Sequence, residues 1–419
     1  MKVISGGISA PKGFMATGAH IGIKKMKKDL CLLQSEVLAE FAGCFTTNKV
    51  KAAPVLWGLE LQAKKAKIKG LVVISGNANA CTGQQGVEDN YALANTFATL
   101  AKVEADNVLV CSTGVIGVNL EIEYVTAGMQ RYFTCMSDDP DSARLAAEAI
   151  MTTDTFSKSI AVEIELGGKK VRIAGMAKGS GMIHPNMATL LSFITTDAAI
   201  SRSVLDSALK DSVKNTYNMI SVDGDTSTND TVLIIANGMA ENSSIKKGTE
   251  DYATFKAALD YVNKKLAIDI VTDGEGATKL IEVKVTGAAT EKDARTIARS
   301  VTSSNLFKTM IFGADANCGR ILCAMGYSGG NFNTDDVSVK FRSYEQDEEA
   351  AVPGHPQEDV LHFMEKSALL RFDEGIAKRL LSRSKIFLDI VLADGEAEAT
   401  AWGCDLTYDY VKINGDYRS

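Results

Sequence analysis

The distribution of apolar residues along this chain predicts β-strands of two kinds. Residues 161–166 and 281–286 alternate between apolar and mostly charged or polar side chains, as expected of strands that are buried on one face. Residues 71–74, 108–110 and 232–236 are continuous apolar runs, which are typical of strands covered on both faces. The pattern therefore predicts sheets covered by helices, while the order and pairing of the strands stay open.

Apolar residues recur at helical spacing in other segments. Residues 204–217 form one such segment, and either Ser201 or Ser203 can cap its beginning. Residues 252–266 form a second, and a third helix is expected after Thr290 because Asp293 follows three positions later. Strands and helices together predict an α/β protein. No repeat and no linker between domains is visible in the sequence.

Composition and charge exclude several classes of protein. With 419 residues, of which 46% are hydrophobic and 23% charged, the chain has ample material for a core and for two or three domains. A net charge of −7 without a dense Lys/Arg cluster argues against a nucleic-acid partner. No apolar run reaches the roughly 18 residues of a membrane span, and no signal peptide is visible, so we expect no membrane partner and a cytoplasmic protein.

No pattern in the sequence indicates a metal site. The four histidines are not clustered, and the eight cysteines contain no CxxC pair. Neither a Walker A sequence nor a strong dinucleotide fingerprint is present. We therefore expect no metal and no bound cofactor.

The residues around Thr189 indicate self-cleavage. Ala188 precedes Thr189, which opens the apolar run 190–194 and follows the Gly-rich, Pro-containing segment 178–185. Attack of the Thr189 hydroxyl on the Ala188 carbonyl would turn the peptide into an ester, which water would open to leave an amino-terminal threonine. Such a residue holds nucleophile and base together, because an α-amine has a pKa of about 7.7–8.0. The alternative is an Ala-Thr pair that merely begins a buried strand.

Thr113 and Gly114 are candidates for binding an oxyanion. They follow the apolar run 108–111, and strand ends are places where enzymes expose backbone N–H groups. Glycine also permits close approach of a ligand to the backbone. The alternative is a plain junction between a strand and a turn.

Residues 175–189, which read Gly-Met-Ala-Lys-Gly-Ser-Gly-Met-Ile-His-Pro-Asn-Met-Ala-Thr, resemble the cleavage signature of the ornithine acetyltransferase (ArgJ) family. Further blocks resemble that family in the same order along the chain: 45–48, 75–80, 112–117, 150–155, 221–230, 315–320 and 410–414. Ordered blocks over nearly the whole chain are more specific than any single motif. The chain is therefore identified as a member of this family.

The resemblance implies an αββα sandwich of the ArgJ and DmpA-like type, with the amino-terminal nucleophile on an inner strand. Cleavage would leave two interwoven chains, residues 1–188 and 189–419, rather than two separable domains. The family also implies a heterotetramer of two chains of each kind.

The implied activity is that of a glutamate N-acetyltransferase of arginine biosynthesis. N²-acetyl-ornithine would acetylate Thr189 and release ornithine, and glutamate would then take the acetyl group, which gives ping-pong kinetics. Some family members also use acetyl-CoA as donor. We favour the single cyclic reaction here because no CoA-binding motif is visible.

The resemblance also assigns residues to the site. The oxyanion pair falls on Thr113 and Gly114, while Lys178 binds substrate through a carboxylate and Glu275 binds the substrate amino group. Without the resemblance, Lys178 would be a solvent-facing loop lysine and Glu275 a turn acid. Further substrate contacts fall on Thr155, Asn414 and Ser419, besides Thr189 itself.

Two residues depart from the family pattern. His184 stands where many members have a small residue, and Cys318 stands where tryptophan is usual. We interpret His184 as a loop substitution, although its place five residues before Thr189 leaves open a role as a local base in cleavage. Cys318 is expected to change packing rather than chemistry.

Two other functions are weighed against the transferase. An N-terminal-nucleophile aminopeptidase or amidase would pass the acyl group to water, and the blocks around Lys178, Glu275 and Asn414 argue against it. A binding protein of the same fold would never cleave, and the intact Ala188-Thr189 pair argues against that.

Overall fold

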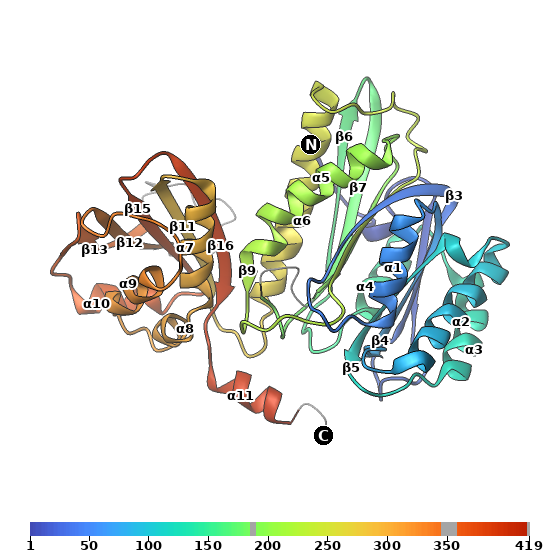
Figure 1. Cartoon of the computed structure of the whole chain (residues 1–419), viewed down its shortest axis with the longest axis horizontal. Helices are drawn as coiled ribbons and strands as arrows, with labels where there is room; N and C mark the ends of the chain where they lie inside the picture. The colour runs from blue at the N-terminus through green and yellow to red at the C-terminus, as the bar shows by residue number, and fades with distance from the viewer. Residues whose placement is uncertain (185–189, 345–357, 417–419) are drawn as a thin grey trace. The chain divides into compact units, whose positions relative to one another are not determined.

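The structure, a computed structural model, describes residues 1–184, 190–344 and 358–416. Ala188, Thr189 and Ser419 lie outside the described residues. The chain divides into unit 1, Met1–Asn218 with Asp225–Ile270, and unit 2, Met219–Gly224 with Val271–Ser419 (Figure 1). These units do not coincide with the expected cleavage products 1–188 and 189–419, which stay a prediction.

One sheet forms the framework of unit 1, with strand order β1-β6-β7-β8-β10-β3-β4-β5 and β2 paired with β3. The strands are β1 (Lys2–Ile4), β2 (Phe14–Ala19), β3 (Leu30–Phe45), β4 (Ile68–Asn77), β5 (Val108–Val115), β6 (Lys158–Leu166), β7 (Lys169–Lys178), β8 (Leu191–Thr196) and β10 (Thr231–Ala236). The long strand β3 joins two layers of this sheet. Its residues 40–45 pair with β10, whereas residues 30–35 pair with β2 and residues 30–39 with β4.

The helices of unit 1 are α1 (Ala53–Ala63), α2 (Gly83–Ala101), α3 (Ile122–Tyr132), α4 (Pro140–Ala149), α5 (Arg202–Asn215) and α6 (Glu250–Thr272), the last two residues of α6 belonging to unit 2. Short 3-10 turns are η1 (Gly7–Ser9), η2 (Ala105–Asn107), η3 (Phe133–Cys135) and η4 (Tyr217–Met219). Of the two predicted capping residues, Ser201 is the residue before α5, although its side chain makes no capping hydrogen bond, and Ser203 lies within the helix.

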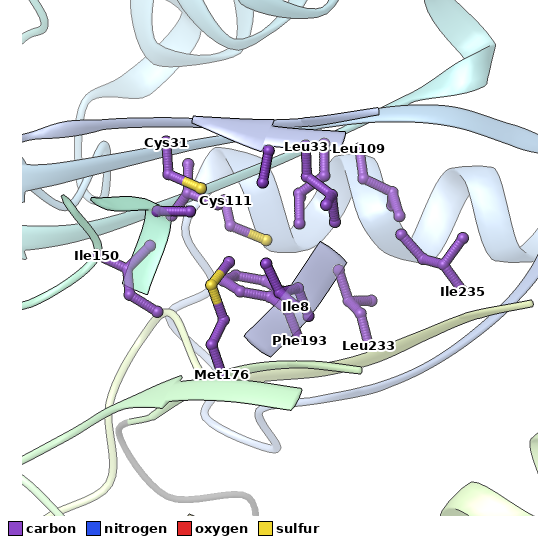
Figure 2. Packing of buried hydrophobic residues seen from close by; sticks show 14 of the residues in the cluster. Ile8, Cys31, Leu33, Leu109, Cys111, Ile150, Met176, Phe193, Leu233 and Ile235 are labelled. Carbon is purple, nitrogen blue, oxygen red and sulfur yellow. The ribbon is translucent and has the colours of Figure 1, made fainter. Parts of the chain in front are cut away.

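Apolar side chains bury both faces of the inner strands, because neighbouring residues of a strand point to opposite sides. On one face, a cluster joins the two layers and includes Leu33, Leu109, Met176, Phe193 and Leu233 (Figure 2). On the other face, a cluster joins the strands to α2 and includes Leu32, Val72, Val110, Leu93 and Phe97. Outside the second layer, α6 lies so close to β7 that a side chain at Gly175 would come within 2.8 Å of Leu266. Unit 1 is an αββα sandwich, as the resemblance predicted.

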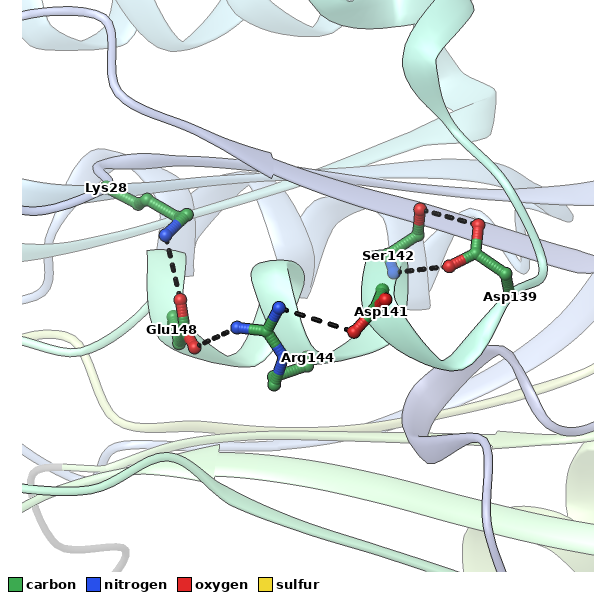
Figure 3. Close-up of polar contacts among 6 residues, drawn as sticks. All are labelled: Lys28, Asp139, Asp141, Ser142, Arg144 and Glu148. Atoms are coloured by element: carbon green, nitrogen blue, oxygen red, sulfur yellow. Dashed lines mark hydrogen bonds and ion pairs between the residues drawn. The ribbon is translucent and has the colours of Figure 1, made fainter.

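Helix α4 is followed directly by residues 150–155, one of the blocks that carried the family resemblance. Asp139 caps its first turn by accepting a hydrogen bond from the Ser142 N–H at 2.8 Å (Figure 3). Near its last turn, Glu148 accepts hydrogen bonds from Arg144 at 2.6 Å and from Lys28 at 2.8 Å (Figure 3). Such half-exposed ion pairs add little stability. The Lys28 contact nevertheless ties the segment before β3 to the end of α4.

A second sheet, of order β14-β13-β12-β15-β11-β16-β9, forms the core of unit 2. Its strands are β9 (Ile220–Ser221), β11 (Leu280–Ala288), β12 (Val337–Tyr344), β13 (Glu358–Glu365), β14 (Ala368–Leu369), β15 (Lys385–Leu392) and β16 (Ala397–Cys404). Its helices are α7 (Glu291–Ser303), α8 (Asn305–Phe312), α9 (Cys318–Gly326), α10 (Glu374–Leu381) and α11 (Tyr408–Gly415). The helix predicted after Thr290 is α7, and the Thr290 side chain accepts a hydrogen bond from the Asp293 N–H as expected. None of the helices in the described ranges is long and apolar enough to cross a membrane.

Candidate active site

Thr113 and Gly114 lie near the carboxyl end of β5, and the backbone there is closely packed. Gly114 pairs with Gly76 of β4, and a Cβ at Gly114 would lie 2.3 Å from the Gly76 carbonyl carbon. Its φ of +134° is also in the range that favours glycine. Thr113 is buried and, by the alternation of the strand, shares the face of Cys111 in the core between the layers. A glycine is thus required at position 114, and the oxyanion role of the pair stays a prediction.

Asn229 connects this strand end to the start of β10. Its buried side-chain amide donates hydrogen bonds to the carbonyl oxygens of Ser112, at 2.7 Å, and Ala78, at 2.6 Å. Ser112 lies within β5, one residue before Thr113, and Ala78 directly follows the neighbouring strand β4. Asn229 therefore fixes the beginning of β10 against the segment that holds Thr113 and Gly114.

Asp230 holds the residue that follows the predicted nucleophile. Its Oδ1 accepts a hydrogen bond from the Leu190 N–H at 3.0 Å, and that nitrogen belongs to the peptide bond that joins Thr189 to Leu190. Asp230 is 1% exposed, and its Oδ2 is buried without a hydrogen-bond partner among the described residues. Burial raises the pKa of Asp230 well above its usual range, while the Leu190 hydrogen bond and the Lys178 charge oppose this less strongly. The structure thus places a carboxyl group that favours its uncharged form beside Leu190, the residue that precedes β8.

Lys178 is the last residue of β7 and is 3% exposed, so it is not the solvent-facing loop lysine that its surroundings in the sequence suggested. It follows Met176 on the strand face that points between the layers. A buried lysine at this place is suited to bind an anionic group of a ligand.

Asp154 brings the Lys178 strand end and the Thr155 segment together. It is almost completely buried and accepts hydrogen bonds from Gly179 N–H at 2.7 Å, from Thr152 N–H at 2.9 Å and from the Lys158 ammonium at 2.7 Å. Burial alone would raise the pKa of Asp154, but the charges of Lys178 and Lys158 outweigh it and hold that pKa below its usual range. Thr155, the next residue, is exposed. Asp154 is thus an ionised link between two predicted substrate contacts.

In unit 2, the structure joins two other predicted contacts directly. The Asn414 side-chain amide donates a hydrogen bond to Glu275 Oε2 at 2.7 Å. The loop around Glu275 packs tightly on the beginning of α11, because a Cβ at Gly276 would lie 2.6 Å from the Tyr410 nitrogen. Glu275 is buried, so it is not an ordinary turn acid. Ser419 lies outside the described residues.

The remaining sequence features are less informative. His184 is half-buried, and Cys318 begins α9, where burial raises the pKa of its thiol. No group of three or more His, Cys, Asp or Glu residues in the described ranges could hold a metal ion. A surface pocket of about 400 Å³ between α1 and α2 is lined by Trp57 and Tyr91 and by none of the predicted site residues.

Asp154, Asn229 and Asp230 were not among the residues predicted from the sequence. All three lie in the blocks 150–155 and 221–230 that carried the resemblance. Their local sequences look like ordinary turns. Only their burial and their distant partners, such as those 25 to 151 positions away, distinguish them.

Comparisons with known proteins agree on one family. The ArgJ family model matches residues 15–419. The arginine biosynthesis bifunctional protein ArgJ of Caldanaerobacter subterraneus subsp. tengcongensis is 51% identical over 419 residues, which cover 100% of both chains. The protein of the same name from Bacillus subtilis is 43% identical over 416 residues, 99% of this chain and 97% of that one.

Solved structures are similar to parts of the chain. The crystal structure of arginine biosynthesis bifunctional protein argJ from Bacillus halodurans is 42% identical and covers 53% of this chain and 97% of that chain, with a TM-score of 0.48. Ornithine acetyltransferase from Mycobacterium tuberculosis, solved in complex with ornithine, is 36% identical and covers 44% of this chain and 97% of that chain, with a TM-score of 0.41. From the family match and from relatives that are similar over their full length, this chain belongs to the ArgJ family.

Proposed function

We propose that this chain is a glutamate N-acetyltransferase of arginine biosynthesis that cleaves itself between Ala188 and Thr189 and then uses Thr189 as its nucleophile. The single observation that carries the proposal is a buried path of hydrogen bonds. It runs from Leu190 to Asp230 and, through the adjacent Asn229, to the Ser112 carbonyl beside Thr113. This path supports a nucleophile at position 189 that works with an oxyanion site at Thr113 and Gly114.

In the proposed reaction, the Thr189 hydroxyl attacks the acetyl carbonyl of N²-acetyl-ornithine and gives its proton to the Thr189 α-amine. The carbonyl oxygen gains the negative charge, which the Thr113 hydroxyl and the Gly114 N–H stabilise. The C–N bond then breaks, ornithine leaves with the proton, and an acetyl ester of Thr189 remains. The glutamate α-amine attacks this ester, and acetylglutamate leaves as the Thr189 hydroxyl is restored.

The substrate contacts of the proposal are Lys178 and Thr155 in unit 1, and Glu275, Asn414 and Ser419 in unit 2. The burial of Lys178 and the hydrogen bond between Asn414 and Glu275 support these assignments. The names of the two relatives include arginine biosynthesis, which supports amino-acid substrates of that pathway.

Those names also include the word bifunctional, which favours a second reaction over the single cyclic one expected from the sequence. For that reaction we propose acetyl-CoA as an alternative donor to the same Thr189. We further propose a cytoplasmic enzyme with two chains of each kind, whose mass can be measured by light scattering.

The experiment that tests the function is a burst measurement. Enzyme mixed with N²-acetyl-ornithine alone is expected to release one equivalent of ornithine and to gain one acetyl group on the fragment that begins with Thr189. Added glutamate then discharges the ester to acetylglutamate. Continuous release of acetate without glutamate would indicate a hydrolase instead, and no mass change would indicate a binding protein. Repeating the burst with acetyl-CoA tests the second donor.

A further inference from the structure

The segment before β3 is built around the buried carboxylate of Asp29. This side chain accepts hydrogen bonds from the N–H groups of Ile21 at 2.7 Å, Gly22 at 3.2 Å and Lys24 at 3.0 Å. The backbone of Asp29 is also linked to the sheet, because its carbonyl oxygen accepts a hydrogen bond from the Ser75 N–H of β4 at 2.9 Å. The backbone of Lys24 is therefore held in place before any ligand arrives.

The side chain of Lys24 runs over the strand pair that contains the candidate oxyanion site. A Cβ at Gly76 would lie 2.9 Å from Lys24 Cγ, and Gly76 is the register partner of Gly114. The φ of Gly76, +107°, favours glycine, and the absence of a side chain there leaves room for Lys24. Lys24 thus lies beside Gly76, the register partner of the candidate oxyanion residue Gly114.

The Lys24 ammonium lies beside residues 151–154, which precede the predicted substrate contact Thr155. It donates one hydrogen bond to the Met151 carbonyl at 2.8 Å, three positions before Asp154. An ammonium group has three donors, and no carboxylate within the described ranges lies at ion-pair distance from it. Burial lowers the pKa of Lys24 to about 8, Lys27 and Lys178 act in the same direction, and Asp29 and Asp154 oppose them. At neutral pH, the group is therefore still mostly charged.

We propose that Lys24 binds the side-chain carboxylate of the acceptor glutamate, an inference that rests on the proposed function. Glutamate has two carboxylates and ornithine has one, so the acceptor requires a second cation in addition to Lys178. Lys24 and Lys178 lie at the two ends of the segment 151–154, one through Met151 and the other through Gly179 and Asp154. Charge-assisted hydrogen bonds from these two lysines would select a dicarboxylic amino acid as acceptor.

The test separates the two half-reactions in Lys24→Gln. The burst of ornithine from N²-acetyl-ornithine is expected not to weaken, because that donor has no second carboxylate and its cationic δ-amine gains nothing from a neighbouring lysine. The KM for glutamate is expected to rise about 10–100-fold, since a hydrogen bond to a charged group is lost. With glutamine as acceptor, which has no side-chain charge, wild type and variant are expected to behave alike. Lys24→Arg keeps the charge and is expected to keep the preference for glutamate.

Lys25→Gln is the matched control, because Lys25 is an exposed neighbour in the same segment. Calorimetric titration of glutamate and glutamine into wild type and Lys24→Gln measures the same preference without turnover, so the inference is tested even without a burst. Failure of the proposed function would appear as no burst in any variant. The inference itself is overturned if glutamate binding is unchanged in Lys24→Gln, or if glutamate and glutamine weaken together.

Discussion

The side-chain amide of Asn229 donates a hydrogen bond to the carbonyl oxygen of Ser112, 2.7 Å away, across the core of unit 1. The two residues are 117 positions apart in sequence. Asn229 precedes the carboxyl that holds Leu190, and Ser112 precedes the candidate oxyanion residues. This one contact therefore sets the spacing between the two halves of the proposed catalytic site.

Asn229→Asp is expected to lower both stability and the rate of cleavage. A carboxylate cannot donate, so the buried carbonyls of Ser112 and Ala78 would each lose a partner, at a cost of about 1–3 kcal/mol per group. Chemical denaturation measures the first effect and time-resolved gel electrophoresis the second. A variant as stable as the wild type that is cleaved at the same rate would show that this contact does not set the spacing.

Self-cleavage is expected to give fragments of 188 residues and 419 − 188 = 231 residues. The larger fragment should begin Thr-Leu-Leu-Ser-Phe, which amino-terminal sequencing can read. Thr189→Ala should stay a single chain without transferase activity, because one hydroxyl serves both reactions, whereas Thr189→Ser should retain some cleavage. A fully active protein that runs as one full-length band would contradict the mechanism.

Thr113→Ala is expected to lower kcat by about 10²–10³-fold, as for the loss of one oxyanion donor. Its fold and its cleavage products should be unchanged, because the substitution removes only a hydroxyl and a methyl group. Steady-state kinetics on the cleaved variant measure the effect. An unchanged kcat would remove Thr113 from the mechanism.

Asp154→Asn is expected to destabilise unit 1 by about 3–5 kcal/mol at neutral pH, because it leaves the buried Lys158 without its carboxylate. The pKa of Asp154 is lowered in the folded state, so its stabilising contribution is present above the unfolded pKa of about 3.9 and is lost as the pH falls further. The difference between wild type and variant should therefore shrink below about pH 4. Denaturation at a series of pH values tests this, and a constant difference would contradict the ionised link.

The stability difference between wild type and Asp230→Asn should depend on pH in the opposite direction to that of Asp154→Asn. The pKa of Asp230 is raised, so the folded state keeps a proton that the unfolded chain loses above about pH 3.9. Wild-type stability should fall with rising pH through this group, and the asparagine variant should lack that loss while still accepting from Leu190. Asp230→Ala, which has no acceptor, should be cleaved more slowly. Equal cleavage of the alanine variant would show that the Leu190 hydrogen bond is dispensable.

Local sequence predicted those parts of the fold that depend on neighbours along the chain. The alternation in 281–286 gave β11, and the Thr290 cap gave the start of α7. Thr113 and Gly114 were predicted as oxyanion residues because they follow an apolar run, and the structure places both within β5. What could not be predicted depends on distant partners: Lys178, which the local sequence placed in an exposed loop, is buried at the end of β7, where it pairs with Leu191 of β8. Likewise, nothing near Asp230 indicates that it holds an N–H group 40 positions away.

The pairing of β7 with β8 has a consequence for how this protein would renature. β7 ends before position 188 and β8 begins after it, yet their residues from Ile173 to Lys178 and from Leu191 to Thr196 pair in one sheet. An uncut chain can form these pairs by itself, so the midpoint of its unfolding does not depend on protein concentration. Once the Ala188–Thr189 bond is cut, the same sheet forms between two molecules, and its recovery after unfolding becomes second order and sensitive to dilution. Cleavage would then turn a chain that can refold by itself into a two-chain assembly that forms efficiently only from the uncut precursor.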